Sequence, residues 1–595
     1  MNLILKSVPA VRRLFFLSIA TAATVSAQST LSLDVGQAAY TINREIYGGL
    51  LENFGRDIYT GLYVGTGSSV PNVNGMRKDA IAAFKECGVT ILDWPGGCFA
   101  ENYNWVNGIG AKTGRPGGDM TNGMGTNEYF QLCDSLKSIP YITANVRTQS
   151  TATMVAWLNY IDTAFPNRLK YWKMGNEPWG GCEGAGIPTI SITDYIARYN
   201  QYKSAIPSKW SGKLLRIADG GTADYLYKVT WIDSLMKCAM GGVEGVTLHY
   251  YGAFSGASID FPVNEYYNRL QVALDISGKL AIYDSIMAKY DPDYTVGLMV
   301  DEWGAWYSNA PGKDYPQSSC RDAVIASLNL NLFNNRCRRI KMGCVAQPVN
   351  TIQSLILTEN PAQNRIVKTP TFYVYKMYKV HQQAKMVPAT LKTSNNQNVP
   401  IISASSSVDS TKNLHISLCN THATATHTVT ITLNNAPAYA SCTGTIVSGP
   451  AFNSYNNFGT AENVNIKSFT GATYSGNTVT VTMPAYSVVT LELTPPQTSV
   501  NGNALGDFNL RTINAVLTAK GSIVVRYSTL RAIPLSLTLY GIDGRTIPAS
   551  SNETLDPGRN SFEWNLRKTS LPSNVYILRI SAGNESKAQR IIATR

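Results

Sequence analysis

The chain has 595 residues, which is enough for about two to four domains with a large buried core. Its formal net charge of +12 is concentrated at the two ends of the sequence. Residues 1–27 contribute three positive charges and no acidic residue, and residues 506–595 contribute a net +6, so the long middle carries only +3. This middle has no basic stripe interleaved with aromatic residues, which excludes nucleic acid as an expected partner.

The N-terminus has the composition of an export signal. Three basic residues precede an apolar run over residues 14–25, and the run closes with the small residues Ser26 and Ala27. This order predicts a secretory signal peptide over residues 1–27. The run is too short to cross a bilayer, and no later segment approaches about 18 uninterrupted apolar residues, so no membrane span is expected.

Residues 46–385 repeat one unit: a short apolar strand, a loop rich in Gly, Asn or aromatic residues, and a helical stretch. The eight predicted strands are 46–54, 89–95, 141–146, 169–175, 215–219, 245–251, 296–303 and 342–349. The predicted helices between them are 77–87, 127–136, 153–164, 193–205, 225–238, 280–289 and 320–335. Eight strands alternating with helices predict an α/β fold, a (β/α)8 or TIM barrel.

The pattern changes on both sides of this barrel. Residues 386–495 alternate apolar and polar residues between Gly and Asn turns, which predicts an antiparallel, jelly-roll-like β-sandwich. Residues 28–45 contain strands without a nearby partner, and we expect them to complete that sandwich. Residues 496–505 have the composition of a linker. Residues 506–595 predict a small C-terminal all-β domain.

Two of the predicted barrel strands end in a glutamate flanked by aromatic residues. Glu177 follows the strand 169–175, where Gly175 frees the backbone to turn, and Glu302 lies at the end of the strand 296–303. A glycosidase needs two such carboxyl groups, one to protonate the leaving oxygen and one to attack or to activate water. A single strand-end acid is as well explained by a helix cap or an ion pair, whereas two at one barrel mouth favour catalysis.

Other polar and aromatic residues stand at the same predicted strand ends. They are Glu52, Asn53, Asn145, Asn176, His249, Tyr250, Tyr251 and Gln347. The five histidines and ten cysteines form no recognisable metal-ligand spacing and no C-x-x-C motif, so neither a metal nor a redox centre is expected. Export permits disulfides, and Cys419 with Cys442, the two cysteines of the predicted sandwich, is the first pair to test.

Six segments together resemble the α-L-arabinofuranosidases of glycoside hydrolase family 51. The segments are 46–59, 94–105, 175–177, 248–251, 301–307 and 346–350, and they occur in the order of that family over residues 30–495. The elements Pro95-Gly-Gly97 and Asp301-Glu-Trp303 together are fairly specific, whereas Asn176-Glu177 alone occurs across the clan. The resemblance implies a retaining enzyme that releases terminal α-L-arabinofuranosyl residues from plant polysaccharides such as arabinoxylan or arabinan, and the signal peptide predicts that this enzyme is secreted. The resemblance implies no cofactor, and it allows a homo-oligomer.

The same resemblance implies a role for each residue of the site. Glu177 would be the general acid/base and Glu302 the nucleophile. Asn176 would hydrogen-bond the 2-hydroxyl of the sugar, in a contact that strengthens in the transition state. The remaining expected substrate-site residues are Glu52 and Gln347 for sugar hydroxyls, His249 and Tyr251 to orient the carboxylates, and Trp306, with Trp179 less firmly, as an apolar wall. Cys98 replaces a substrate-contacting Asn, so only its backbone contact carries over.

The chain departs from the family at Asp93, where an arginine is usual. An aspartate there opposes ionisation of neighbouring carboxyl groups, which raises their pKa values. One hypothesis is that Arg147, at the end of the third strand, replaces part of the missing charge. The alternative is that Arg147 is a solvated loop residue.

The last 90 residues are similar to the C-terminal sorting domains of bacterial type IX secretion cargo. The likeness rests on the segments 539–545 and 575–581 and on a final strand with Lys587, Arg590 and Arg595. It implies export to the cell surface or the medium through a secretion machinery that reads residues 506–595. The alternative is a small β-sandwich module with another purpose.

Two other functions remain open from the sequence. One is an endo-acting β-glucanase or xylanase of the same clan, which would differ in its loops and have an open cleft. The other is a non-catalytic polysaccharide-binding surface protein that has lost turnover through Asp93. The presence of both glutamates argues against this second alternative.

Overall fold

The computed structural model describes residues 28–180, 186–221, 229–239, 241–252, 255–307, 318–359 and 364–496, and then seven strands between residues 514 and 593. The predicted signal peptide, residues 1–27, lies outside the described residues, as does the predicted linker apart from Pro496. The chain divides into two compact units, residues 1–496 and 497–595. No helix of the described residues is long and apolar enough to cross a membrane.

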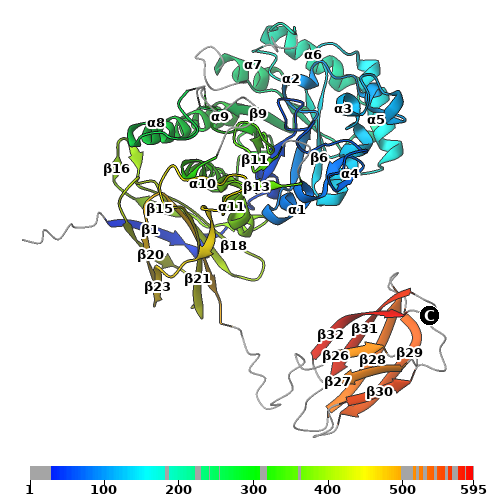
Figure 1. The fold of residues 1–595 in the computed structure, drawn as a ribbon, viewed down its shortest axis with the longest axis vertical. Coiled ribbons are helices and arrows are strands. Elements are labelled where there is room, and N and C mark those ends of the chain that lie inside the picture. The colour runs from blue at the N-terminus through cyan, green and yellow to red at the C-terminus, as the bar shows by residue number, and fades with distance from the viewer. Residues whose placement is uncertain are drawn as a thin grey trace, which may run out of the picture. The chain divides into compact units, whose positions relative to one another are not determined.

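Eight parallel strands close into a barrel surrounded by helices (Figure 1). In chain order they are β2 (Gly48–Leu50), β5 (Ile91–Trp94), β6 (Ile139–Ala144), β7 (Tyr171–Met174), β8 (Leu215–Ala218), β9 (Gly245–Tyr250), β10 (Gly297–Trp303) and β11 (Ile340–Ala346). Each is hydrogen-bonded to the next in this order, and β11 returns to pair with β2. The TIM-barrel prediction is therefore confirmed, with each expected strand in its place.

The seven predicted helices are also present, most with boundaries shifted by a few residues, and residues 225–228 of the fifth lie outside the described residues. They are α1 (Lys78–Cys87), α4 (Thr126–Leu136), α5 (Thr151–Ala164), α6 (Ile192–Ala205), α7 (Val229–Ala239), α9 (Ile276–Tyr290) and α10 (Cys320–Asn335). Besides the four-residue helices α2 (Gly97–Ala100) and α3 (Asp119–Asn122), the described residues contain two longer helices that were not predicted, α8 (Val263–Leu274) and α11 (Pro370–Tyr378). Both are rich in tyrosine, a residue with only a modest helix propensity, so the local sequence signal for a helix is weak there.

Alternation along each strand separates a barrel interior from the layer beneath the helices. In β7, Tyr171 belongs to the small cluster inside the barrel, and Trp172 packs in the large cluster between barrel and helices. Lys173 is next on the inward side and has no exposed surface. A charged residue at such a position needs buried partners, and these partners lie near the carboxyl end of the barrel.

The β-sandwich is built from two sheets that share one core (Figure 1). One sheet has the order β15-β1-β20-β24-β23 and the other β14-β18-β19-β25-β21-β22. The strands are β1 (Gln28–Asp34), β14 (Lys385–Met386), β15 (Ala389–Lys392), β18 (Ile402–Val408), β19 (Leu414–Asn420), β20 (His427–Asn434), β21 (Ser441–Ser448), β22 (Asn465–Ser468), β23 (Ala472–Ser475), β24 (Thr478–Met483) and β25 (Ser487–Thr494). The N-terminal strand β1 lies inside the first sheet, antiparallel to β15 and parallel to β20.

Cys419 and Cys442, the first pair to test for a disulfide, are not bonded to each other, because both thiols are free. Cys419 lies on β19 and Cys442 on β21, and these strands pair with opposite edges of β25. Two strand spacings amount to about 9–10 Å, well beyond the roughly 4.4–6.8 Å between Cα atoms that a disulfide tolerates. Cys98, in contrast, is disulfide-bonded.

The second unit contains antiparallel strands in two sheets, with the orders β26-β27-β30 and β29-β28-β31-β32. The strands are β26 (Asn514–Leu517), β27 (Ser522–Arg526), β28 (Ile533–Gly541), β29 (Thr546–Leu555), β30 (Ser561–Asn565), β31 (Asn574–Ala582) and β32 (Glu585–Ala593).

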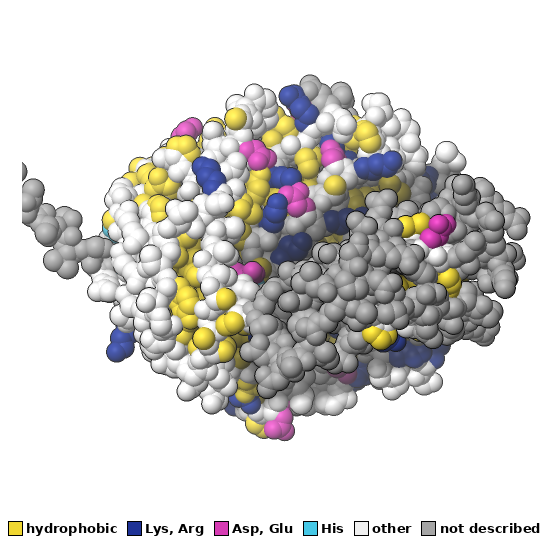
Figure 2. Space-filling view, turned by 90° about the horizontal axis from the view of Figure 1, so that it is seen from below, with side chains coloured by type: hydrophobic (Ala, Val, Ile, Leu, Met, Phe, Trp, Pro, Cys, Tyr) yellow, Lys and Arg dark blue, Asp and Glu magenta, His cyan; other side chains and the backbone are white. Residues whose placement is uncertain are grey.

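On the described surface shown in Figure 2, Lys and Arg side chains are interspersed with Asp and Glu. That face carries no continuous basic stripe of the kind that nucleic acid would require.

Candidate active site

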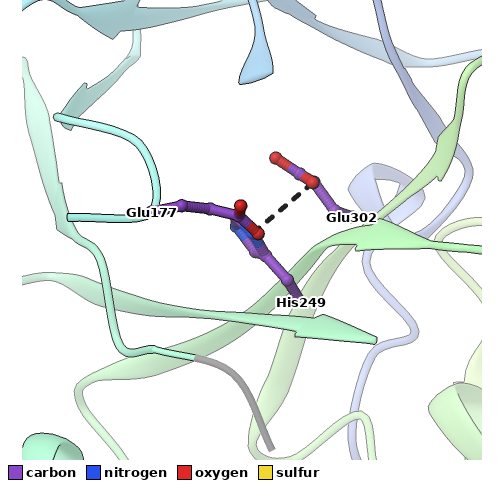
Figure 3. A group of neighbouring side chains, drawn as sticks. All are labelled: Glu177, His249 and Glu302. Carbon is purple, nitrogen blue, oxygen red and sulfur yellow. Dashed lines mark hydrogen bonds and ion pairs between the residues drawn. The ribbon is translucent and has the colours of Figure 1, made fainter. Parts of the chain in front are cut away.

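The two glutamates meet at the carboxyl end of the barrel. Glu177 follows β7, the fourth barrel strand, and Glu302 lies in β10, the seventh. Figure 3 shows their side chains and that of His249 pointing toward one another. One ligand atom from each of the three lies within 4.8 Å of the other two. A carboxyl separation of about 5 Å is typical of glycosidases that retain anomeric configuration.

His249, in β9, connects the two carboxyl groups. Its Nδ1 lies 2.8 Å from Oε1 of Glu177 and 3.4 Å from Oε2 of Glu302, while its Nε2 lies 3.3 Å from Oδ1 of Asp301. Tyr251 donates its hydroxyl to Oε2 of Glu302 at 2.6 Å. Both His249 and Tyr251 therefore contact the glutamates that they were expected to orient.

A strained turn presents Asn176 and Glu177 at the mouth. Gly175 has φ +88° and Glu177 has φ +42°, so the chain enters the left-handed region twice within three residues. Two buried acids hold this turn through its backbone: Glu101 accepts from the amide of Asn176 at 2.8 Å, and Asp219 accepts from the amide of Glu177 at 2.9 Å. Sequence reasoning assigned neither of them. Asp219 could have been found, because it directly follows the strand β8.

Glu52 and Gln347 form a pair just beyond the ends of β2 and β11, which are neighbours in the barrel. The amide of Gln347 donates to Oε2 of Glu52 at 3.0 Å, and the backbone amide of Phe99 donates to Oε1 at 3.3 Å. Gly97 allows this approach, because a Cβ at that position would lie 2.2 Å from the Glu52 carboxyl group. Burial raises the pKa of Glu52 to about 7, against the lowering effect of these hydrogen bonds.

Aromatic side chains lie beside the catalytic groups. The ring of Trp306 packs edge-to-face against Tyr251, with centroids 5.5 Å apart, and against Phe54 at 5.8 Å. Trp306 is therefore in contact with a residue that touches Glu302, as a wall of the sugar site would be. Trp179 donates its indole N–H to Asp219 at 3.2 Å and so belongs to the support of the Glu177 turn.

The hypothesis that Arg147 compensates for Asp93 is wrong. The charge of Arg147 faces Glu101, which also accepts a hydrogen bond from the Arg147 backbone amide at 3.1 Å. Asp93 is instead paired with Lys173, whose Nζ lies 3.4 Å from its Oδ2, and it accepts a hydrogen bond from Thr143 at 2.6 Å. Sequence reasoning had no means of choosing between the two cations, because only the fold shows which one points inward.

Burial and charge set the protonation of the site. Burial lowers the pKa of His249, but the charges of Glu302 and Asp301 outweigh it and raise that pKa well above its usual range. Burial raises the pKa of Glu302 to about 8, while the His249 charge opposes this rise and the Glu177 charge adds to it.

Comparison with known proteins gives a consistent result. Residues 301–487 match the model of the α-L-arabinofuranosidase C-terminal domain. The chain is 35% identical over 515 residues to an intracellular exo-α-L-arabinofuranosidase from Bacteroides ovatus, covering 80% of this chain and 98% of that protein. It is 28% identical to a probable α-L-arabinofuranosidase C from Aspergillus fumigatus, covering 60% of this chain and 75% of that protein.

Solved structures show the same fold. The family 51 arabinofuranosidase from Xanthomonas axonopodis pv. citri superposes with a TM-score of 0.73 at 30% identity, covering 79% of this chain and 100% of that one. The arabinose complex of the Thermotoga maritima α-L-arabinofuranosidase superposes with a TM-score of 0.69 at 22% identity, covering 78% of this chain and 99% of that one. On the identity and coverage of these relatives, the chain belongs to the α-L-arabinofuranosidases of glycoside hydrolase family 51.

Proposed function

We propose that this enzyme releases terminal α-L-arabinofuranosyl residues from plant polysaccharides such as arabinoxylan or arabinan, with retention of configuration. The observation that carries the proposal is the convergence of Glu177 and Glu302 around His249, with ligand atoms within 4.8 Å. The exposure of each glutamate side chain fits its proposed role. The side chain of Glu177 is 21% exposed and can reach a leaving group, whereas that of Glu302 is 5% exposed and lies deeper in the barrel.

The geometry supports a double displacement. Glu302 attacks the anomeric carbon while Glu177 donates its proton to the glycosidic oxygen, so the C–O bond breaks and the polysaccharide leaves. Glu177, now a carboxylate, then takes a proton from water, and the resulting hydroxide attacks the anomeric carbon and releases Glu302. His249 and the hydroxyl of Tyr251 keep the two carboxyl groups oriented throughout. Glu52, Gln347 and Asn176 bind sugar hydroxyls, and Trp306 covers an apolar face.

The test compares the wild-type enzyme with Glu302→Ala and Glu177→Ala on arabinoxylan. We expect the wild type to release L-arabinose whose first-formed anomer is α by proton NMR, and Glu302→Ala to lose at least about 10³-fold in kcat. On p-nitrophenyl α-L-arabinofuranoside, whose leaving group departs without protonation, added azide should rescue Glu177→Ala, because a small anion can attack the glycosyl-enzyme without a general base. An inverted first product would exclude the double displacement. Hydrolysis of soluble β-glucan in preference to p-nitrophenyl α-L-arabinofuranoside would favour the endo-acting alternative.

We also propose that the chain is exported and that residues 506–595 direct its sorting. Support comes from the basic, apolar and small-residue order of residues 1–27 and from the sequence likeness of the tail, whose described strands form a unit of their own. Deleting residues 506–595 should leave arabinofuranosidase activity intact while the protein accumulates in the periplasm. Normal release of the truncated enzyme to the surface or medium would refute the sorting role. Recovery of full-length protein with residues 1–27 uncleaved in the cytoplasm would refute export.

A further inference from the structure

Lys173 occupies the centre of the barrel directly below the catalytic groups. Its side chain has no exposed surface, and its Nζ lies 2.9 Å from Oδ2 of Asp301, 3.2 Å from Oδ1 of Asn176 and 3.4 Å from Oδ2 of Asp93. Two of these contacts are hydrogen bonds, to Asp301 and Asn176, and the third is an ion pair with Asp93, so the partners come from three parts of the barrel mouth. A buried ion cluster of this kind is weak evidence for stability, because desolvation offsets most of its attraction. Its position therefore needs another explanation.

The contact with Asp301 extends to both glutamates. Asp301 also has no exposed surface, and its Oδ2 accepts from Lys173 and from the hydroxyl of Tyr141 at 3.0 Å. Its other oxygen is thereby left for Nε2 of His249 at 3.3 Å. Because His249 contacts Glu177 and Glu302 with its opposite nitrogen, the position of Lys173 determines the ring orientation that aligns the two carboxyl groups.

The contact with Asn176 fixes the direction of a carboxamide. Lysine can only donate hydrogen bonds, so the atom of Asn176 that faces it must be the amide oxygen. The amide nitrogen is then the end left for a ligand, and it can only donate. An Asn176 held in this way would recognise a sugar hydroxyl through the oxygen of that hydroxyl and would discriminate against an analogue that lacks it.

The charge of Lys173 also acts on the nucleophile. The titratable groups that face Glu302 are His249, Glu177, Tyr251, Lys173 and Asp301. Burial lowers the pKa of Lys173, but Asp301 and Asp93 outweigh it and raise that pKa well above its usual range, so the ammonium stays charged. Among the groups that face Glu302, Lys173 and His249 carry positive charge and favour its ionised form.

We propose that Lys173 is a positioning residue of the glycosidase reaction, which locks Asn176 as a donor toward the sugar 2-hydroxyl and holds Asp301 and His249 beneath the two glutamates. This inference rests on the proposed function, because it assumes that Glu177, Glu302 and Asn176 act as acid/base, nucleophile and sugar ligand. It assigns to an inward-facing strand residue the organisation of the whole catalytic layer, with Asp93 as the counter-ion that keeps Lys173 in place.

The test is Lys173→Met, which keeps the length of the side chain and removes its charge. Lys341→Met is the matched control, because Lys341 is a half-buried barrel lysine whose Nζ donates to the Cys337 carbonyl at 3.0 Å and touches no catalytic group. Each variant is assayed on p-nitrophenyl α-L-arabinofuranoside and on its 2-deoxy analogue, with kcat/KM measured from pH 4 to 9. Lys173→Met should lower the ratio of kcat/KM for the parent substrate to kcat/KM for its 2-deoxy analogue about 10-fold or more, because the variant loses one hydrogen bond to an oriented group. Its acidic limb should move to higher pH.

A second variant separates positioning from folding. Lys173→Met leaves two buried aspartates without their cation, so Asp93→Asn combined with Lys173→Met removes one of these charges and should recover most of the lost thermal stability. The discrimination ratio and the acidic limb of this double variant should remain altered. The inference would be overturned if the double variant recovered a discrimination ratio within threefold of the wild type together with the wild-type acidic limb. It would also be overturned by an unchanged ratio in Lys173→Met or in the double variant. A wild-type enzyme without arabinofuranosidase activity would instead overturn the proposed function, and this inference with it.

Discussion

The hydroxyl of Tyr251 contacts the nucleophile directly, 2.6 Å from Oε2 of Glu302. Tyr251→Phe removes that donor and leaves the ring that packs against Trp306. A hydrogen bond to a charged group contributes about 1.5–3 kcal/mol, and about 1.4 kcal/mol corresponds to one pKa unit. Because the hydroxyl stabilises the ionised carboxylate, its loss raises the pKa of Glu302. The acidic limb of the kcat/KM profile, which requires an ionised nucleophile, should therefore move up by about one to two pH units.

The assay is kcat/KM for p-nitrophenyl α-L-arabinofuranoside across pH, with Tyr266→Phe as the control. Tyr266 is fully buried, and its hydroxyl donates to the Thr421 carbonyl at 3.0 Å and does not contact the glutamates. The control should lose about 1 kcal/mol of stability and keep the wild-type pH profile. An acidic limb of Tyr251→Phe that stays in place or moves to lower pH would refute this reasoning about Glu302.

Two more outcomes follow from buried groups. Gly97→Ala places a methyl group 2.2 Å from the Glu52 carboxyl group, so kcat/KM should fall at least about 10-fold. In the control Gly110→Ala the new methyl group meets no neighbour, and only the stability of the loop should fall. Equal activity of the two variants would contradict a role for Glu52. Burial lowers the pKa of His381 to about 3, whereas the pKa of a histidine in the unfolded chain is about 6.5. Between these two pH values the unfolded state binds one more proton than the folded state. Stability therefore falls as the pH drops through that window, by at most about 1.4 kcal/mol per pH unit. Urea unfolding of wild type and His381→Gln at pH 7 and pH 5 should show the smaller loss in the variant.

The barrel could be predicted because its signal is local and repeated. Each strand is a short apolar run with a turn after it, and eight runs in order permit few other folds. The catalytic pair could be predicted from the sequence for the same reason, because the ends of the strands determine which residues meet at the barrel mouth. The role of Lys173 could not be predicted, because alternation along a strand shows which residues share a face and not which buried partners on other strands they contact. Glu101 reaches the site from a loop, and no strand pattern marks it.

The same limit applies to pairings between distant segments. Cys419 and Cys442 share a domain, but the intervening strand β25 that separates them is visible only once the sheet order is known. The helices α8 and α11 were missed because burial of their tyrosines against the barrel and sandwich, not intrinsic preference, stabilises them.

The parallel pairing of β1 with β20 ties an early strand to residues synthesised much later, with Gln28 opposite Thr428 and Asp34 opposite Asn434. Until residue 434 has left the ribosome, β1 lacks this neighbour, so one edge of the strand has no complete hydrogen-bonded partner. Closing so long a loop makes completion of this sheet slow, which leaves the nascent chain open for whatever acts on the residues before Gln28. A recombinant version that starts after Asp34 would expose the edges of β15 and β20 and invite aggregation.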